Sequence, residues 1–300
     1  MAAGLPFAGS GKVFIVGDSG TANLSVLKDL FIPDAEGKIR FYSTIDAAVG
    51  ACTANAGDVI LVMPGHTESI TAAGSLDLDV AGITIIGLGN GSDRPLIDYP
   101  STGLTTADVD IDAANIKIVN CVFDMTGKDA IAAGIDVNAN DFTMERCRVV
   151  MGDSDGQAVV GVLSDTNVDR VTIDDCEFVG DTIAGPAAAI RLIGGVEHKI
   201  RRNFILGSFS QGPIALITTA PLRILIEGNS LINKVASGDA AIVGIAGATG
   251  VVRYNSYEHT TDSLGDWLKT PGSLSSFENY GVNALGETGI LDITGGLSTT

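Results

Sequence analysis

One short pattern recurs through the middle of this 300-residue chain and constrains its fold more than any other feature. Six copies align, and each places a cysteine or an asparagine at the same position, 26 to 29 residues after the previous one. A regular period in this range is typical of stacked structural repeats. The aligned positions, which we call the column, are Cys121, Cys147, Cys176, Asn203, Asn229 and Asn255.

Each copy alternates apolar and polar residues around its column residue. In the second copy, Phe142, Met144 and Val149 share one face of the expected strands, and a turn falls just before Cys147. Another short strand pattern precedes each copy. A repeat of about 26 residues is too short for a strand-helix-strand unit, which takes roughly 30 or more. We therefore predict an all-β fold, a parallel β-helix solenoid whose coils stack at about 4.8 Å.

The segment before the repeats predicts a capping helix. Ser43 and Asp46 form an S-x-x-D capping pattern, and Ile45, Ala48 and Val49 follow at helical spacing. We expect a helix over residues 43–54 to cover the open end of the stack, which would otherwise expose core and unpaired backbone.

This organisation divides the chain into three parts. Residues 1–40 are an N-terminal attachment arm with a strand at 12–16 and a short helix at 23–31. Residues 41–258 form the β-helix with its capping helix, and residues 259–300 form a C-terminal cap and tail.

Composition narrows the classes of partner. The chain is 45% hydrophobic and 18% charged, which suffices for one large core. Its net charge of −18 should repel nucleic acid, so we expect no nucleic-acid partner. No apolar run approaches the roughly 20 residues of a membrane-spanning helix, and no secretory signal pattern is visible. We expect no membrane association.

In-register stacking assigns structural roles to the column. Cys121, Cys147 and Cys176 would lie about 4.8 Å apart, beyond the roughly 3.5–4.5 Å between the Cβ atoms of a disulfide, so we expect free buried thiols. The asparagines would hydrogen-bond to one another along the axis. Charged residues just before the column predict two ion-pair ladders that fix the register, Asp174–Arg201–Glu227–Arg253 and Arg146–Asp175–Arg202.

Two groups of stretches carry a resemblance to known proteins. The helix pattern followed by GDVILVMPG (57–65) and GITIIGLG (82–89) resembles the N-terminal cap of the pectin-lyase-like superfamily. The stretches FYSTIDAA (41–48), PGHTESI (64–70), GLGNGSDRP (87–95) and FENYGVNALGETG (277–289) resemble β-helical virion structural proteins of tailed bacteriophages. The resemblance implies a right-handed β-helix in a virion.

Carboxylate pairs are the first catalytic candidates. Asp174–Asp175 resembles the paired aspartates of β-helical polygalacturonases, which act as acid and base on a glycosidic bond. The NTD, His-Gly and RIK signatures of that family are missing, so we interpret the pair as part of the charge ladders. Asp110 and Asp136 would stack as adjacent carboxylates. Either a cation relieves their repulsion or they form a solvated acidic face, the interpretation we favour.

Serine, histidine and tryptophan give weaker signals. Ser19 in GDSG resembles the nucleophile block of SGNH hydrolases, but the D-x-x-H of that family is absent, and a turn explains the string. We interpret His66 as a turn residue bonded to backbone and His198 as a satisfied core histidine. Trp267 is expected in a short helical cap, with a sugar-stacking platform as the alternative. We predict no catalytic, cofactor or metal site.

We therefore expect a non-enzymatic virion protein on the capsid surface, a decoration (head auxiliary) protein. It would dock on the major capsid protein or other virion proteins through residues 1–40 or the C-terminal tail, as a homotrimer. The alternative is a tail spike or adhesin that binds or cleaves host surface polysaccharide. An aromatic content of only 5% speaks against an extended sugar groove. A free-standing polysaccharide lyase or hydrolase is a third hypothesis.

Overall fold

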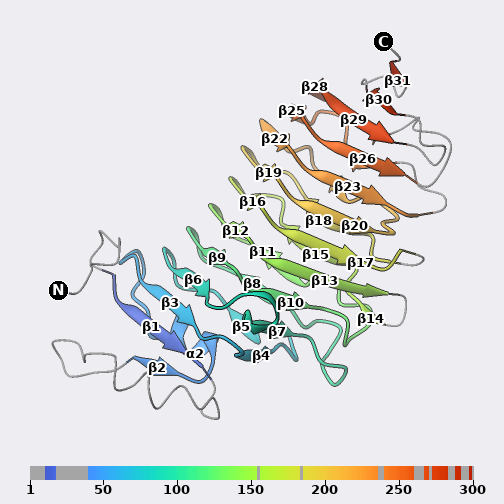
Figure 1. Cartoon of the computed structure of the whole chain (residues 1–300). Coiled ribbons are helices and arrows are strands. Elements are labelled where there is room, and N and C mark those ends of the chain that lie inside the picture. Colours follow the sequence, from blue (N-terminus) through green and yellow to red (C-terminus); the bar gives the residue numbers. More distant parts are fainter. Residues whose placement is uncertain are drawn as a thin grey trace.

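The chain folds into a parallel β-helix solenoid with three long sheets, as the repeat predicts (Figure 1). The structure is a computed structural model that describes residues 11–17, 40–153, 156–182, 185–235, 240–259, 267–269, 272–282, 288–291 and 297–298. Successive coils each contribute one strand to each sheet, so strands about one period apart in sequence are hydrogen-bonded neighbours.

The three sheets are named A, B and C. Sheet A runs in the order β2 (Phe41–Tyr42), β1 (Val13–Val16), β3 (Val59–Val62), β6 (Thr84–Gly87), β9 (Lys117–Val119), β12 (Thr143–Glu145), β16 (Thr172–Asp174), β19 (Lys199–Arg201), β22 (Ile224–Glu227), β25 (Thr249–Arg253) and β28 (Ser273–Phe277). Sheet B runs β31 (Leu297–Ser298), β30 (Thr288–Leu291), β29 (Asn279–Val282), β26 (Ser256–His259), β23 (Ser230–Asn233), β20 (Phe204–Gly207), β17 (Glu177–Gly180), β13 (Arg148–Asp153), β10 (Val122–Asp124), β7 (Leu96–Asp98) and β4 (Thr67–Ser69), with β14 (Gly156–Gln157) on β13. Sheet C runs β27 (Leu268–Lys269), β24 (Ile242–Val243), β21 (Ile214–Leu216), β18 (Ala188–Leu192), β15 (Val160–Ser164), β11 (Ile135–Val137), β8 (Val109–Ile111) and β5 (Leu76–Asp77).

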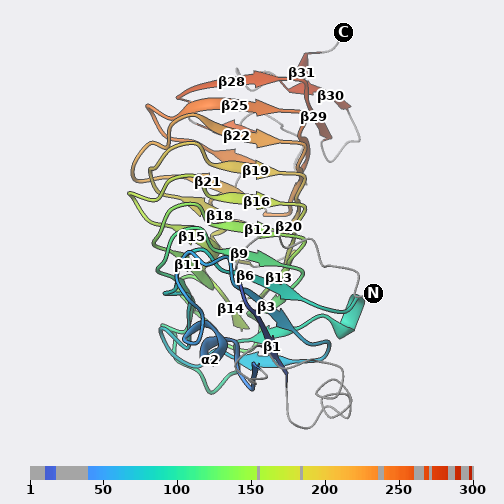
Figure 2. The same cartoon turned by 90° about the vertical axis from the view of Figure 1, so that its left-hand side faces the viewer.

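The apolar positions of the repeat fill the interior. Figure 2 shows sheet A as a ladder whose strands climb from β1 to β28. One inward position of this ladder holds a continuous stack of buried side chains, because in-register parallel strands superimpose equivalent residues. The stack comprises Ile118, Met144, Ile173, Ile200, Ile226 and Val252.

The predicted helical cap over residues 43–54 is wrong. The helix found there, α2 (Ile45–Val49), has five residues, and Thr44 rather than Ser43 caps it by accepting a hydrogen bond from the Ala47 amide. The end of sheet A is instead made of strands, because β1 pairs between β2 and β3. Among the described residues no helix is long and apolar enough to span a membrane.

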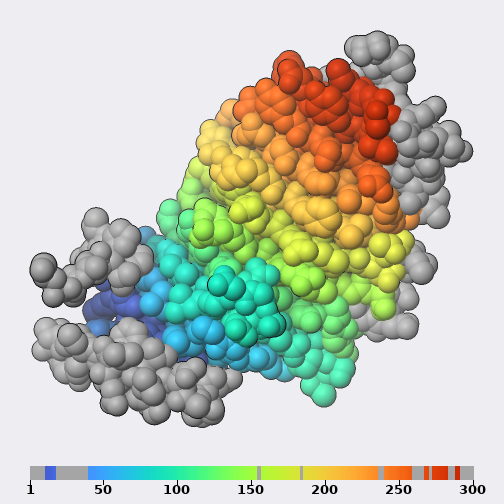
Figure 3. All heavy atoms as spheres, viewed as in Figure 1, coloured from blue at the N-terminus to red at the C-terminus, as the bar shows by residue number. Residues whose placement is uncertain are grey.

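The predicted strand at residues 12–16 is present as β1, and it belongs to sheet A. The predicted helix at 23–31 lies outside the described residues. At the opposite end (Figure 3, red), sheet B is closed by antiparallel pairing of β29 with β30 and of β30 with β31. The division of the chain at residues 40 and 258 stays a prediction.

Candidate functional site

The three column cysteines are free thiols inside the core, as predicted. Cys121, Cys147 and Cys176 are buried, and none forms a disulfide. The sulfurs of Cys147 and Cys176 lie 3.4 and 3.3 Å from the carbonyl oxygens of Glu145 and Asp174. Burial raises the pKa of the Cys121 and Cys176 thiols well above the ordinary value. These groups act as small apolar fillers.

The column asparagines form a continuous ladder. The Nδ2 of Asn203 donates to Oδ1 of Asn229 at 3.0 Å, and the Nδ2 of Asn229 donates to Oδ1 of Asn255 at 2.9 Å. Each Oδ1 also accepts the backbone amide of the coil before it. The ladder continues to Asn279, which the six-copy alignment did not include, at 2.9 Å from Asn255. The column is therefore internal scaffold.

The predicted ion-pair ladders are only partly formed. Arg201 pairs with Asp174 at 2.7 Å, and Arg253 pairs with Glu227 at 2.8 Å. Arg201 and Glu227 are register neighbours, but no ion pair joins them in the described structure. Arg202 contacts Asp174 at 2.5 Å, not Asp175. The long side chain of Arg202 reaches back to the end of β16 on the previous coil, where buried Asp174 also pairs with Arg201.

The Asp174–Asp175 pair is therefore split between two environments. Asp174 is 4% exposed and receives both guanidinium groups, so its carboxylate is committed to holding adjacent coils together. Asp175 is exposed, has a left-handed backbone (φ 54°) and forms no ion pair with a described residue. Two carboxylates that flank a glycosidic bond as acid and base must both face the substrate. The buried position of Asp174 does not meet that requirement.

Two histidines are buried in the solenoid. His198 accepts the Val171 amide on Nδ1 at 3.2 Å and donates from Nε2 to the Gly194 carbonyl at 2.9 Å. Burial lowers its pKa below the ordinary value, so the ring is neutral at pH 7. His198 is thus a satisfied core residue, as predicted.

His66 was predicted to bond to backbone, but its ring also contacts a carboxylate. Its Nε2 lies 2.9 Å from Oε2 of Glu68, and the same oxygen accepts the Ile45 amide at 2.8 Å. Both side chains are buried. The pair anchors the first turn of α2 to β4.

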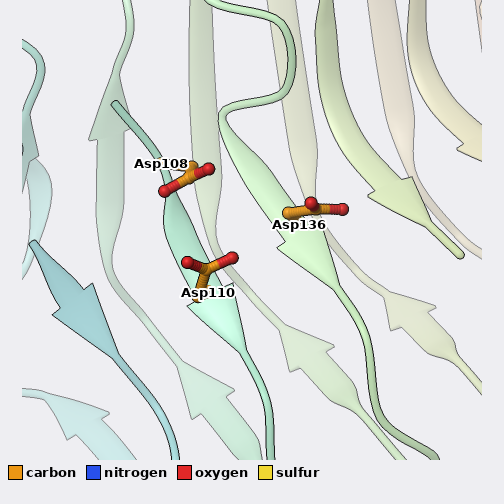
Figure 4. Close-up of side chains that lie close together, drawn as sticks. All are labelled: Asp108, Asp110 and Asp136. Carbon is orange, nitrogen blue, oxygen red and sulfur yellow. The ribbon is translucent and has the colours of Figure 1, made fainter. Parts of the chain in front are cut away.

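Three aspartates meet on the outer face of sheet C. Asp108 and Asp110 stand two residues apart at β8, and Asp136 lies on the neighbouring strand β11 (Figure 4). Asp110 and Asp136 are register partners, as the sequence predicts, and a carboxylate oxygen from each of the three lies within 4.8 Å of the others. Asp108 also accepts the Gly74 amide at 3.1 Å. Oxygen ligands at this spacing suit a hard cation such as Ca²⁺, and a solvated acidic face is the alternative.

The electrostatics of this cluster follow from partial burial and like charge. Burial and the neighbouring carboxylates of Asp110 and Asp108 raise the pKa of Asp136 from 3.8 to about 6. Burial is also the main cause that raises the pKa of Asp108 and of Asp110. Sequence reasoning missed Asp108, although residues two apart on one strand share a face.

A second feature that sequence reasoning missed is a groove lined by arginines along the corner between sheets A and B. It consists of two adjoining hollows of about 480 and 550 Å³ that share Arg94 and Glu177. The cations that line it are Arg94, Arg146, Arg148 and Arg202. The signal was available in the column alignment, since Arg146 and Arg202 occupy the position just before the column residue.

Two further candidates, Trp267 and Ser19, remain. Trp267 is 1% exposed and packs in the core, so its ring is no exposed platform for a sugar. Ser19, with the rest of the GDSG turn after Gly17, lies outside the described residues.

No protein-family model and no curated protein matches the chain. The fold defines the class of the protein, a three-sheet parallel β-helix solenoid.

Proposed function

We propose that this protein is a non-enzymatic structural component of a tailed-bacteriophage virion, a decoration protein on the capsid surface. The observation that carries the proposal is the use of chemically capable side chains as internal ties between coils. The asparagine ladder and Asp174 bond between coils, and the column thiols fill the core as free, buried groups. Buried ladders of this kind hold a rod rigid and in register, which suits a projecting structural element.

The resemblance of residues 41–48, 64–70, 87–95 and 277–289 to phage virion proteins supports the same proposal. In this proposal the β-helix has the right-handed coil of the pectin-lyase-like group and assembles as a homotrimer. It docks on the major capsid protein through residues 1–40 or the C-terminal tail.

The test is to locate the chain on intact particles. Cryo-electron microscopy of purified virions should show rod-shaped density on the capsid that fits the solenoid, at a three-fold position. Mass spectrometry of the same particles should detect the chain in a fixed ratio to the capsid protein. A soluble monomer absent from purified virions contradicts the proposal.

A tail spike or adhesin that binds host polysaccharide is the second candidate function. The arginine-lined groove favours it, because four arginines give a local positive charge on a chain of net charge −18, and such a charge attracts anions. Density at the tail rather than the head, together with glycan binding, would distinguish this candidate from the first.

A further inference from the structure

Cys147 and Cys176 form a pair of stacked thiols beside the arginine-lined groove. They occupy equivalent positions on neighbouring coils, because β12 pairs in register with β16 just before them and β13 with β17 just after them. Each sulfur lies near two carbonyl oxygens, one from two residues earlier in the chain and one on the preceding coil. These equivalent surroundings give both side chains the same orientation. The two sulfurs therefore stack along the solenoid axis at about 4.8 Å, the spacing of the strands.

This separation is too long for a disulfide but matches the span of a bridging metal ion. A disulfide brings its two sulfurs to about 2.05 Å. A metal–thiolate bond is about 2.3 Å long, so an ion in line between two sulfurs holds them about 4.6 Å apart. In-register stacking thus places the two thiols at the spacing that linear ligation of a metal ion requires.

Backbone amides donate hydrogen bonds to the sulfurs of this pair. The Cys121 amide donates to the sulfur of Cys147, and the Cys147 amide donates to the sulfur of Cys176. On the next coil an asparagine oxygen takes this place, since the Cys176 amide donates to Oδ1 of Asn203 at 2.9 Å. Hydrogen bonds to sulfur favour the thiolate, which is the form that binds metals.

The electrostatic surroundings also favour the thiolate form of Cys147. Burial raises the pKa of Cys147, but hydrogen bonds from the Cys176 thiol and the Cys121 amide outweigh the burial. The positive charge of Arg94 acts in the same direction, so the pKa of Cys147 falls below its ordinary value. The arginine-lined hollow of about 480 Å³ reaches both Cys147 and Cys176, which gives a small ion a path from solvent.

We propose that Cys147 and Cys176 bind one Cu(I) ion in a linear site of two thiolates. Soft thiolate ligands select Cu(I), zinc and iron–sulfur clusters. Zinc and such clusters take four protein ligands, whereas this site offers two thiolates. Among the described residues, the one group of three metal-binding side chains close together is the aspartate cluster on sheet C.

The chemistry of binding is a ligand exchange without electron transfer. Two copper–sulfur bonds form, both thiol protons leave to solvent, and neither copper nor sulfur changes its oxidation state. The bound site carries one negative charge, which the arginines of the hollow offset. The proposal concerns the isolated chain and does not depend on its place in a virion.

The test is an anaerobic titration of the full chain, reduced and free of metal, with Cu(I) in competition with a colorimetric Cu(I) chelator. We expect one ion per chain and an ultraviolet absorption band from thiolate-to-copper charge transfer. The affinity should fall by up to about 100-fold per pH unit on acidification, because two protons are released. Cys176→Ser should weaken binding at least about 100-fold, since one thiolate remains. Zn²⁺ should bind at least about tenfold more weakly than Cu(I).

Cys52→Ser is the matched control, because half-buried Cys52 lies outside the column, and it should bind Cu(I) as the unaltered chain does. Arg94→Gln keeps both ligands and should weaken binding at pH 7, because it removes a charge that favours the thiolate. The thermal midpoint of each metal-free variant reports whether it folds. Absence of Cu(I) binding to the unaltered chain, or unchanged affinity in Cys176→Ser, would overturn the proposal. If Cys176→Ser does not fold, unchanged affinity in Arg94→Gln overturns it instead.

Discussion

Asn229 and Asn255 are joined in the core by a side-chain hydrogen bond of 2.9 Å, and the Asn255 oxygen that accepts it also accepts the Asn229 backbone amide. One amide therefore satisfies two donors of the preceding coil. Repetition of this pair over successive coils makes a polar column inside an apolar stack, and every member depends on its neighbours for satisfaction.

Asn229→Ala should destabilise the protein by about 2–3 kcal/mol, because it leaves the Asn203 backbone amide buried without its acceptor and removes one of the two donors to the Asn255 oxygen. Chemical denaturation measures this loss. Asn138→Ala is the control, since the exposed side chain of Asn138 bonds the exposed side chain of Asp112, and its loss should change stability by less than about 0.5 kcal/mol. Equal effects of the two substitutions would contradict a structural role for the ladder.

Asp174→Asn should cost about 2 kcal/mol of unfolding free energy. It leaves Arg201 and Arg202 without their shared carboxylate, and their partial exposure keeps the loss below that of a fully buried pair. Asp175→Asn, one residue away on an exposed turn, is the matched control and should be nearly neutral. If Asp175→Asn proved the more damaging substitution, the predicted Arg202–Asp175 pair would be the correct one.

Asp136→Asn should stabilise the protein at neutral pH. The pKa of Asp136 is about 6 in the folded state against 3.8 ordinarily, so the folded protein holds this proton more tightly than the unfolded chain does. The resulting contribution to the free energy of unfolding is present below pH 3.8 and is lost as the pH rises through 6. After allowance for solvent screening, we expect a gain of about 1 kcal/mol at pH 7 and none below pH 3.8. Denaturation curves across this range check the prediction, and a gain independent of pH would count against it.

The interpretation of Asp108, Asp110 and Asp136 as a solvated acidic face predicts no metal dependence of stability. Addition of Ca²⁺ to protein treated with chelator should leave the thermal midpoint unchanged in the unaltered chain and in Asp136→Asn alike. A rise with Ca²⁺ in the unaltered chain that Asp136→Asn abolishes would show that the cluster holds the cation.

All four cysteines should be free thiols that can be titrated without any reduction step. In the native protein the three column thiols should resist an aromatic disulfide reagent because they are buried. Half-buried Cys52 should react slowly at pH 8, because burial and the nearby Asp58 charge raise its pKa to about 12. After denaturation four thiols should titrate, and a lower number would reveal a disulfide.

Much of the fold is predictable from the chain because the repeat is periodic. Spacing alone placed Cys121 through Asn255 in one column and predicted its thiols and amides correctly. The capping helix was not predictable in the same way. Thr44 and Asp46 do start a helix, but whether it covers the end of the stack depends on β1, which pairs between β2 and β3 against the order of the sequence.

The candidate sites were likewise predictable only where they depend on the register of the repeat. Register placed Asp110 beside Asp136, and the two-residue spacing of Asp108 and Asp110 predicts that Asp108 shares their face, although it lies one residue before β8. Arg202 was expected on Asp175 and lies on Asp174, because a long flexible side chain reaches across a coil boundary in a way that alignment does not specify.

The sequence by itself therefore determined the solenoid, since in-register parallel strands turn a linear period into a stack. The tertiary structure alone decided which charges pair, how the N-terminal end is closed and where the arginines form a groove. These features depend on side-chain reach and on contacts between segments far apart in sequence, neither of which a repeat period encodes.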